Sequence, residues 1–168
     1  MGIIQANRNI RILFTGGGSG GHVFPLISVL REMHKFKPDF DKKGLELSFY
    51  YIGSNDFTLN FVKDEDVEVQ SLNMKKMKKN IFGIFINMFS LILAYFKVLM
   101  IMPDAIFAKG GFESCFVLVI GIIFRIPIFI HESDSIPGFT NQFFAKFAKI
   151  VFVSFEESKK HIKNSNIE

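Results

Sequence analysis

The chain has 168 residues, a formal net charge of +4 and 49% hydrophobic residues, among them 22 phenylalanines. This length suits one domain with a substantial core, and the basic cluster "MKKMKK" is a local patch rather than a nucleic-acid-binding surface. The single cysteine, Cys115, excludes an internal disulfide, and no signal peptide precedes the first predicted strand, so we expect a cytosolic protein. The apolar composition predicts that some surface faces something other than water.

Short apolar segments alternate along the chain with longer segments of helical periodicity. Several of the short segments are apolar at consecutive positions, which is typical of parallel strands covered on both faces. The alternation indicates βαβ units and predicts an α/β fold, a Rossmann-like open parallel sheet flanked by helices in a single domain over 1–168. The predicted strands are 10–15, 45–52, 67–72, 104–108, 127–130 and 150–153, and the predicted helices are 24–35, 57–63, 81–102, 113–125, 138–146 and one beginning near Glu156.

A glycine-rich loop, "TGGGSGGH", joins the first predicted strand to the first predicted helix. Glycines allow a close backbone approach to a ligand, and a helix start offers free N–H groups at the positive end of its dipole. Ligands of open α/β sheets bind at this edge, beyond the carboxyl ends of the strands. The loop is therefore suited to a phosphate group or another anion.

Two known phosphate-binding motifs fit the loop only in part. Gly16 and Gly21 have P-loop spacing, but "HV" follows where Lys and Ser or Thr are required, which argues against a Walker A site. The loop also contains G-x-G-x-x-G, but the second predicted strand does not end in the acidic residue that would bind a ribose, and Asp56 comes only later. A dinucleotide-binding oxidoreductase domain remains an alternative.

Two further loops follow strands and open helices, "AKGGFES" at 108–114 and "HESDSIPGFTN" at 131–141. Each of them alone could be a tight turn or a helix start. Because three such loops lie at the same edge of one sheet, we expect them to form a single ligand site.

The segments "GGGSGGHVFP", "KGGF" and "HESDSIPGFTN", in this order and spacing, resemble the amino-terminal half of the MurG family of peptidoglycan glycosyltransferases. The resemblance covers about 10–157. It implies the amino-terminal half of a GT-B glycosyltransferase that transfers N-acetylglucosamine from UDP-N-acetylglucosamine to lipid I, with inversion, to make lipid II. The chain ends about where the family's carboxy-terminal donor-binding domain would begin, so we expect an acceptor-binding domain that is inactive alone. The alternative is a non-catalytic membrane-docking subunit of a split glycosyltransferase.

The resemblance also implies the residues of the site, with glycine loops that receive the acceptor's pyrophosphate. His22 is the expected catalytic base and Glu132 the competing candidate, while phosphate contact or loop structure is the alternative role of His22. Phe112 stands where many members have Tyr, and Asp134 where many have Asn, which leaves hydrogen-bonding details open. No metal or cofactor is expected. The expected substrate-binding residues are Gly17, Gly18, Ser19, Gly20, Gly21, Gly110, Gly111, Phe112, His131, Asp134 and Asn141.

The predicted helix 81–102 is long enough to span a bilayer, yet it could equally be a core helix or lie on a membrane surface. Polar or small residues form one narrow stripe along it, at Asn80, Gly83, Asn87, Ser90, Ala94 and Lys97. A span would separate two strands of one sheet, whereas an apolar face beside "MKKMKK" suits an anionic lipid surface. We therefore expect peripheral docking at the cytoplasmic face of the membrane, as the resemblance also implies, through Lys75, Lys76, Lys78, Lys79, Phe82, Phe85, Phe89, Leu93 and Phe96.

Overall fold

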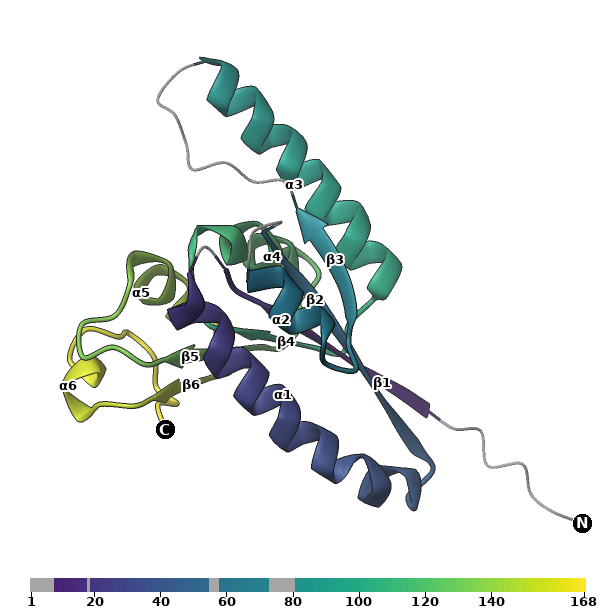
Figure 1. The fold of residues 1–168 in the computed structure, drawn as a ribbon. Helices are drawn as coiled ribbons and strands as arrows, with labels where there is room; N and C mark the ends of the chain where they lie inside the picture. Colours follow the sequence, from purple (N-terminus) through teal and green to yellow (C-terminus); the bar gives the residue numbers. More distant parts are fainter. Residues whose placement is uncertain (1–7, 18, 55–57, 73–80) are drawn as a thin grey trace, which may run out of the picture.

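The computed structural model describes residues 8–17, 19–54, 58–72 and 81–168, of which 54 and 81–87 are described by their backbone alone. The predicted alternation of strands and helices is confirmed (Figure 1). The strands are β1 (Arg8–Thr15), β2 (Leu45–Ser54), β3 (Glu68–Leu72), β4 (Ala105–Ala108), β5 (Ile128–Glu132) and β6 (Ile150–Val153). The helices are α1 (Gly20–Asp41), α2 (Thr58–Lys63), α3 (Ile81–Ile101), α4 (Phe112–Ile123), α5 (Phe139–Ala145) and α6 (Glu156–Lys159).

The six strands form one sheet in the order β3-β2-β1-β4-β5-β6, and every neighbouring pair is parallel. The strand order reverses direction between β1 and β4, so the loops after these two strands leave the sheet side by side. Thr15 pairs in register with Ala108, which in turn pairs with Ile130. The Rossmann-like prediction is confirmed, and the switch point of the sheet lies where the glycine loops begin.

Two apolar cores cover the two faces of the sheet. Leu13 and Phe14 point to opposite faces because side chains alternate along a strand. Leu13 belongs to the core beneath α3, α4 and α5, and Phe14 to the core beneath α1 and α2. Figure 1 shows α1 and α3 on opposite sides of the sheet. The consecutive apolar residues of the strands are therefore explained by burial on both faces.

Helix α1 is longer than the predicted 24–35, because it begins at Gly20 and ends at Asp41. The amides of His22 and Val23 both donate to the carbonyl of Ser19, at 3.1 and 3.3 Å, which starts the helix within the glycine-rich segment. Glycines have poor helix propensity, but the burial of the next turns against the sheet outweighs it. As a result His22 lies in the first turn of the helix and not in the loop before it.

Helix α3 packs on the core through two small and two branched apolar residues. Ser90, Ala94, Val98 and Ile101 are buried, so Ser90 and Ala94 of the predicted stripe face inward, whereas Lys97 of the same stripe is half-buried. The opposite side, called here the α3 apolar face, is exposed and consists of Met88, Phe89, Ile92, Tyr95, Phe96, Leu99 and Met100. In the described parts of the chain, none of the helices has both the length and the hydropathy that a bilayer span needs.

We expect Ala94→Leu to lower the free energy of unfolding by about 1–3 kcal/mol, because Ala94 is fully buried and larger side chains overpack a core. The matched control is Ile92→Leu on the exposed side of the same helix, which should change stability by less than about 0.5 kcal/mol. Urea denaturation of both variants measures the difference. Equal losses would mean that the helix packs through another face.

Candidate functional site

The first two loops meet at the switch point of the sheet. The amide of Lys109 donates to the carbonyl of Thr15 at 3.1 Å, which joins the end of β4 to the end of β1. Gly111 has a φ of 91°, and a Cβ at this position would lie 2.7 Å from the carbonyl oxygen of Gly17. Only glycine allows both this conformation and this approach. Gly111 is therefore required for the contact between the two glycine loops.

The third loop closes on the second in the same way. Gly110 has a φ of 92°, and a Cβ there would lie 2.7 Å from Oδ1 of Asn141. The Nδ2 group of Asn141 donates to the carbonyls of Lys109 and His131, each at 3.3 Å. The Thr140 hydroxyl donates to the carbonyl of Gly111 at 3.2 Å. The three loops thus form one packed unit at the carboxyl edge of the sheet.

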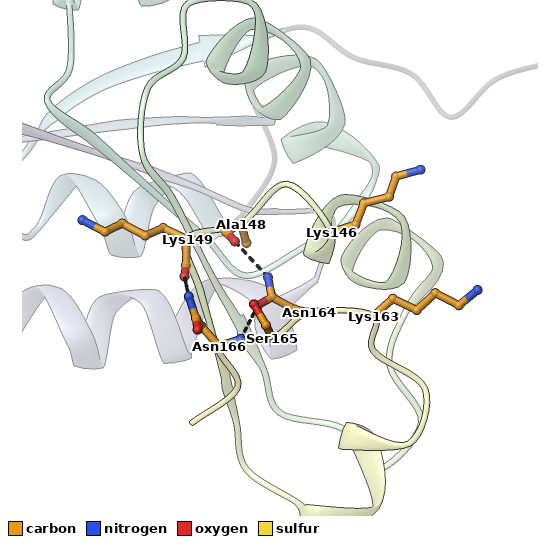
Figure 2. A pocket seen from close by; sticks show the side chains of 7 residues that line it. All are labelled: Lys146, Ala148, Lys149, Lys163, Asn164, Ser165 and Asn166. Atoms are coloured by element: carbon orange, nitrogen blue, oxygen red, sulfur yellow. Dashed lines mark hydrogen bonds between the residues drawn. The ribbon is translucent and has the colours of Figure 1, made fainter.

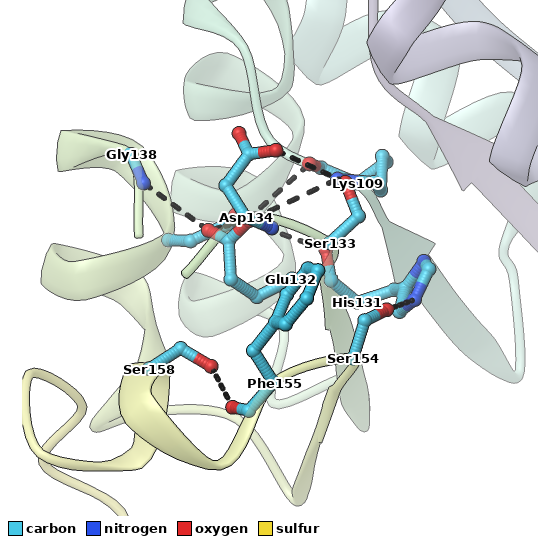
Figure 3. A network of polar contacts seen from close by, with 10 residues as sticks. Lys109, His131, Glu132, Ser133, Asp134, Gly138, Ser154, Phe155 and Ser158 are labelled. Atoms are coloured by element: carbon cyan, nitrogen blue, oxygen red, sulfur yellow. Dashed lines mark hydrogen bonds and ion pairs between the residues drawn. The ribbon is translucent and has the colours of Figure 1, made fainter. Parts of the chain in front are cut away.

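Glu132 organises the third loop from within. Glu132 as a whole is 1% exposed, and its Oε1 accepts from the amide of Asp134 at 2.9 Å. Oε2 accepts from the amide of Gly138 at 3.1 Å and from Nδ2 of Asn141 at 2.9 Å. Figure 3 shows Glu132 between Gly138 on one side and Lys109 on the other. These hydrogen bonds hold the third loop in its conformation. A ligand hydroxyl that donated its proton to Glu132 would have to compete with the three donors that the carboxylate already has.

The two predicted histidines lie at the same edge of the sheet. His22 is half-buried in the first turn of α1, and His131 is half-buried at the end of β5. Burial lowers the pKa of His131, the charge of Lys109 adds to this effect, and the charge of Glu132 opposes it. Nε2 of His131 lies 3.4 Å from the Ser154 hydroxyl. The lowered pKa favours a neutral imidazole at His131.

Buried polar atoms without a protein partner gather at this edge. Among the described residues, six buried side-chain atoms have no hydrogen-bond partner, and four of them belong to the loops or their strand ends. Since buried polar groups are normally hydrogen-bonded, these atoms are available to a ligand or to water. The four atoms are Thr15 Oγ1, His22 Nδ1, His131 Nδ1 and Asn141 Oδ1.

The remaining predicted substrate-binding residues lie around the same edge. Gly17 is buried, Ser19 is the exposed N-cap of α1, and Asp134 is exposed. Phe112 is half-buried and packs edge-to-face on Phe116, with 5.4 Å between the ring centroids. Gly20 and Gly21 form the start of α1, and Gly18 lies outside the described residues.

The predicted membrane residues are described only in part. Lys75, Lys76, Lys78 and Lys79, and the side chains of Phe82 and Phe85, lie outside the described residues. Phe89 and Phe96 are exposed on the α3 apolar face, whereas Leu93 is half-buried and packs against the core.

Sequence reasoning missed two residues of the site. Lys109 is 1% exposed, and its ammonium lies 4.0 Å from Oε1 of Glu132. Tyr51, buried on β2, donates its hydroxyl to the carbonyl of Gly16. The position of Lys109, between a strand end and a pair of glycines, could have indicated from the sequence that it belongs to the site. Nothing in the sequence around Tyr51 indicates its contact with a loop 35 residues away.

A hollow of about 420 Å³ lies away from these loops, near the amino end of β6 (Figure 2). Asn164 closes one side of it by donating to the carbonyls of Ala145 and Ala148, at 2.6 and 2.8 Å. Its three lysines, Lys146, Lys149 and Lys163, point in different directions. Because their ammonium groups do not converge, the hollow has no arrangement that would hold a single small anion.

Comparisons with known proteins agree with this geometry. The model of the glycosyltransferase family 28 N-terminal domain matches residues 12–153. Over 163 residues the chain is 35% identical to UDP-N-acetylglucosamine–N-acetylmuramyl-(pentapeptide) pyrophosphoryl-undecaprenol N-acetylglucosamine transferase 3 of Bacillus thuringiensis (strain Al Hakam), covering 94% of this chain and 44% of the relative. It is 33% identical over 167 residues to the transferase of that name from Borreliella burgdorferi, covering 95% of this chain and 44% of the relative. The chain thus spans less than half the length of these relatives.

Among solved structures, the crystal structure of Acinetobacter baumannii MurG matches with a TM-score of 0.76 at 21% identity. The match covers 94% of this chain and 44% of that one. At this identity the likeness concerns the fold, and it agrees with the amino-terminal domain of a GT-B enzyme.

We expect Glu132→Gln to destabilise the fold by about 3–5 kcal/mol, because it leaves the buried Lys109 ammonium without its nearest countercharge. The amide nitrogen of the new Gln side chain would also face N–H groups that now donate to the carboxylate, so at least one of these donors would lose its acceptor. Asp134→Asn is the matched control, since the side chain of Asp134 is exposed, and it should change stability by less than about 0.5 kcal/mol. Chemical denaturation measures both, and a neutral effect of Glu132→Gln would contradict the structural role of this carboxylate.

Proposed function

The chain belongs to the glycosyltransferase family 28 N-terminal domains, and on this premise we propose that it forms the acceptor-binding half of a hexosyltransferase. The reaction is transfer of N-acetylglucosamine from UDP-N-acetylglucosamine to lipid I, with inversion, to give lipid II. The names of its relatives from Bacillus thuringiensis and Borreliella burgdorferi support this substrate pair. A carboxy-terminal domain would bind the donor nucleotide. Family membership favours this function over a dinucleotide-binding oxidoreductase.

The observation that carries the proposal is the gathering of four unpartnered buried polar atoms around two glycine loops at one edge of the sheet. The amino ends of α1 and α4 follow these loops, and Gly111 before α4 approaches Gly17 before α1, so both helix starts offer N–H groups and positive dipole ends close to the loops. Such an arrangement binds phosphate groups without special side chains. A lipid-linked pyrophosphate has this chemistry.

We assign the role of general base to His22. The ring lies in the first turn of α1, directly after the glycine loop, and its Nδ1 has no partner among the described residues. In the reaction the C4 hydroxyl oxygen of the acceptor attacks the anomeric carbon of the donor sugar. The bond from that carbon to UDP breaks, and the hydroxyl proton passes to the imidazole of His22. Glu132, with both oxygens engaged, positions the third loop instead.

We also propose that the α3 apolar face docks on an anionic membrane surface, at its cytoplasmic side. The ring centroid of Tyr95, on this face, lies 5.5 Å from that of Phe124, which directly follows α4. Ile123 at the end of α4 is also exposed, so the apolar surface continues from α3 onto a second helix. Contiguous exposed apolar surface of this kind is typical of membrane or protein contacts. The neighbouring "MKKMKK" supplies positive charge in the sequence, which favours an anionic lipid surface.

The proposed reaction is tested by sugar transfer from UDP-N-acetylglucosamine to lipid I in vesicles. We expect no turnover from this chain alone and turnover when the carboxy-terminal half of a relative is supplied separately. His22→Ala should lower kcat by about 100-fold or more in the mixture, because general-base catalysis contributes about that much. His161→Ala, at an exposed histidine, is the control. Absence of turnover with a carboxy-terminal half that binds UDP would contradict the catalytic role and leave the docking subunit as the function.

Membrane docking is tested by co-sedimentation with vesicles that contain anionic lipids. Phe96 is 54% exposed on the α3 apolar face and Phe36 is 56% exposed on α1, so the two provide a matched pair. We expect Phe96→Ser to weaken partitioning about tenfold, as expected for losing one buried aromatic side chain, and Phe36→Ser to leave it unchanged. Added salt should weaken the binding of the unmodified chain. Equal partitioning of both variants would show that the membrane contacts another surface.

A further inference from the structure

Lys109 is buried at the point where all three loops meet. Its amide donates to Thr15 in the first strand end, and its carbonyl accepts from Asn141 of the third loop. A Cβ at Gly16 would lie 3.4 Å from the Cβ of Lys109, so the side chain leaves the backbone directly beneath the first glycine loop. With 1% of its surface exposed, it is among the largest fully buried side chains of the described chain.

The charge of this lysine is only partly balanced. Its ammonium lies 4.0 Å from Oε1 of Glu132, which is beyond hydrogen-bond distance, and it donates no hydrogen bond within the described part of the chain. The oxygens of Glu132 already accept from three neutral donors. Burial lowers the pKa of Lys109, while the charges of Glu132 and Asp134 oppose this shift. Burying an ammonium group without a hydrogen bond costs free energy, and an anionic ligand that accepts from Lys109 would offset this cost.

The composition of the loops indicates what that partner is. The segments 14–25, 108–114 and 131–141 contain three carboxylates, Glu113, Glu132 and Asp134, and a single Lys or Arg, which is Lys109. Without Lys109 the loops would carry a net negative charge and would repel a phosphate group. Backbone amides and helix dipoles supply only partial positive charge.

We propose that Lys109 supplies the full positive charge that binds a diphosphate group at the glycine loops. The location of this group rests on the proposed function, in which the loops receive a pyrophosphate. The lipid-linked acceptor and UDP both contain a diphosphate group, and Lys109 would bind that group. The competing role is purely structural, with Lys109 serving only as the counterion of Glu132.

The test measures binding of inorganic pyrophosphate, undecaprenyl pyrophosphate in detergent micelles, and UDP to the chain alone. We expect Lys109→Met to weaken diphosphate binding about 10- to 100-fold, Lys109→Arg to retain most of it, and the exposed control Lys149→Met to retain all of it. Loss confined to undecaprenyl and inorganic pyrophosphate assigns the site to the lipid acceptor, and loss of UDP binding as well assigns it to diphosphates of both sources. Failure of the unmodified chain to bind pyrophosphate in any form overturns the proposal.

A second variant separates binding from folding. Lys109→Met combined with Glu132→Gln removes both buried charges, so we expect it to unfold at a higher denaturant concentration than Glu132→Gln alone while diphosphate binding stays weak. Recovery of diphosphate affinity in the double variant would overturn the proposal, because Lys109 would then act only through Glu132. Since these measurements need no sugar transfer, they stand apart from the catalytic test: an inactive mixture with intact, Lys109-dependent binding would refute the reaction and retain the site.

Discussion

The buried carboxylate of Glu132 is the interaction on which the site depends. It sits at the end of β5, accepts hydrogen bonds from two backbone amides and from Asn141, and faces the ammonium of Lys109. Asn141 and Lys109 in turn reach the second loop and the end of β1. A charge buried this deeply is stable only while its donors remain in place, so the three loops must keep one arrangement together.

Close backbone packing complements this polar network. Gly110 and Gly111 bring the second loop against Asn141 and Gly17, at distances that leave no room for a side chain. The packing role of these glycines follows from the absence of a Cβ, and in the proposed function the same absence would let a ligand approach the backbone.

Helix α3 divides its surface between two environments. Small residues such as Ser90 and Ala94 are buried on its inner side, while the aromatic residues Phe89, Tyr95 and Phe96 are exposed on its outer side. Val98 and Ile101 also face the core, so α3 has apolar residues on both its inner and its outer side. In the proposed function the outer side meets lipid, so a lipid-linked acceptor and the glycine loops would be held by the same domain.

The sequence by itself determined the order of the elements, the parallel sheet and the three loops, because these follow from local periodicity and from the turn chemistry of glycine and proline. It also marked His22, Glu132 and Asn141 as residues of one edge, since strand ends of a parallel sheet meet there. Only the tertiary structure decided that His22 lies within α1, that both carboxylate oxygens of Glu132 accept hydrogen bonds from the third loop, and that Lys109 is buried between the loops. These properties arise from contacts between residues far apart in the chain, whose desolvation and close packing exist only once β1, β4 and β5 are side by side.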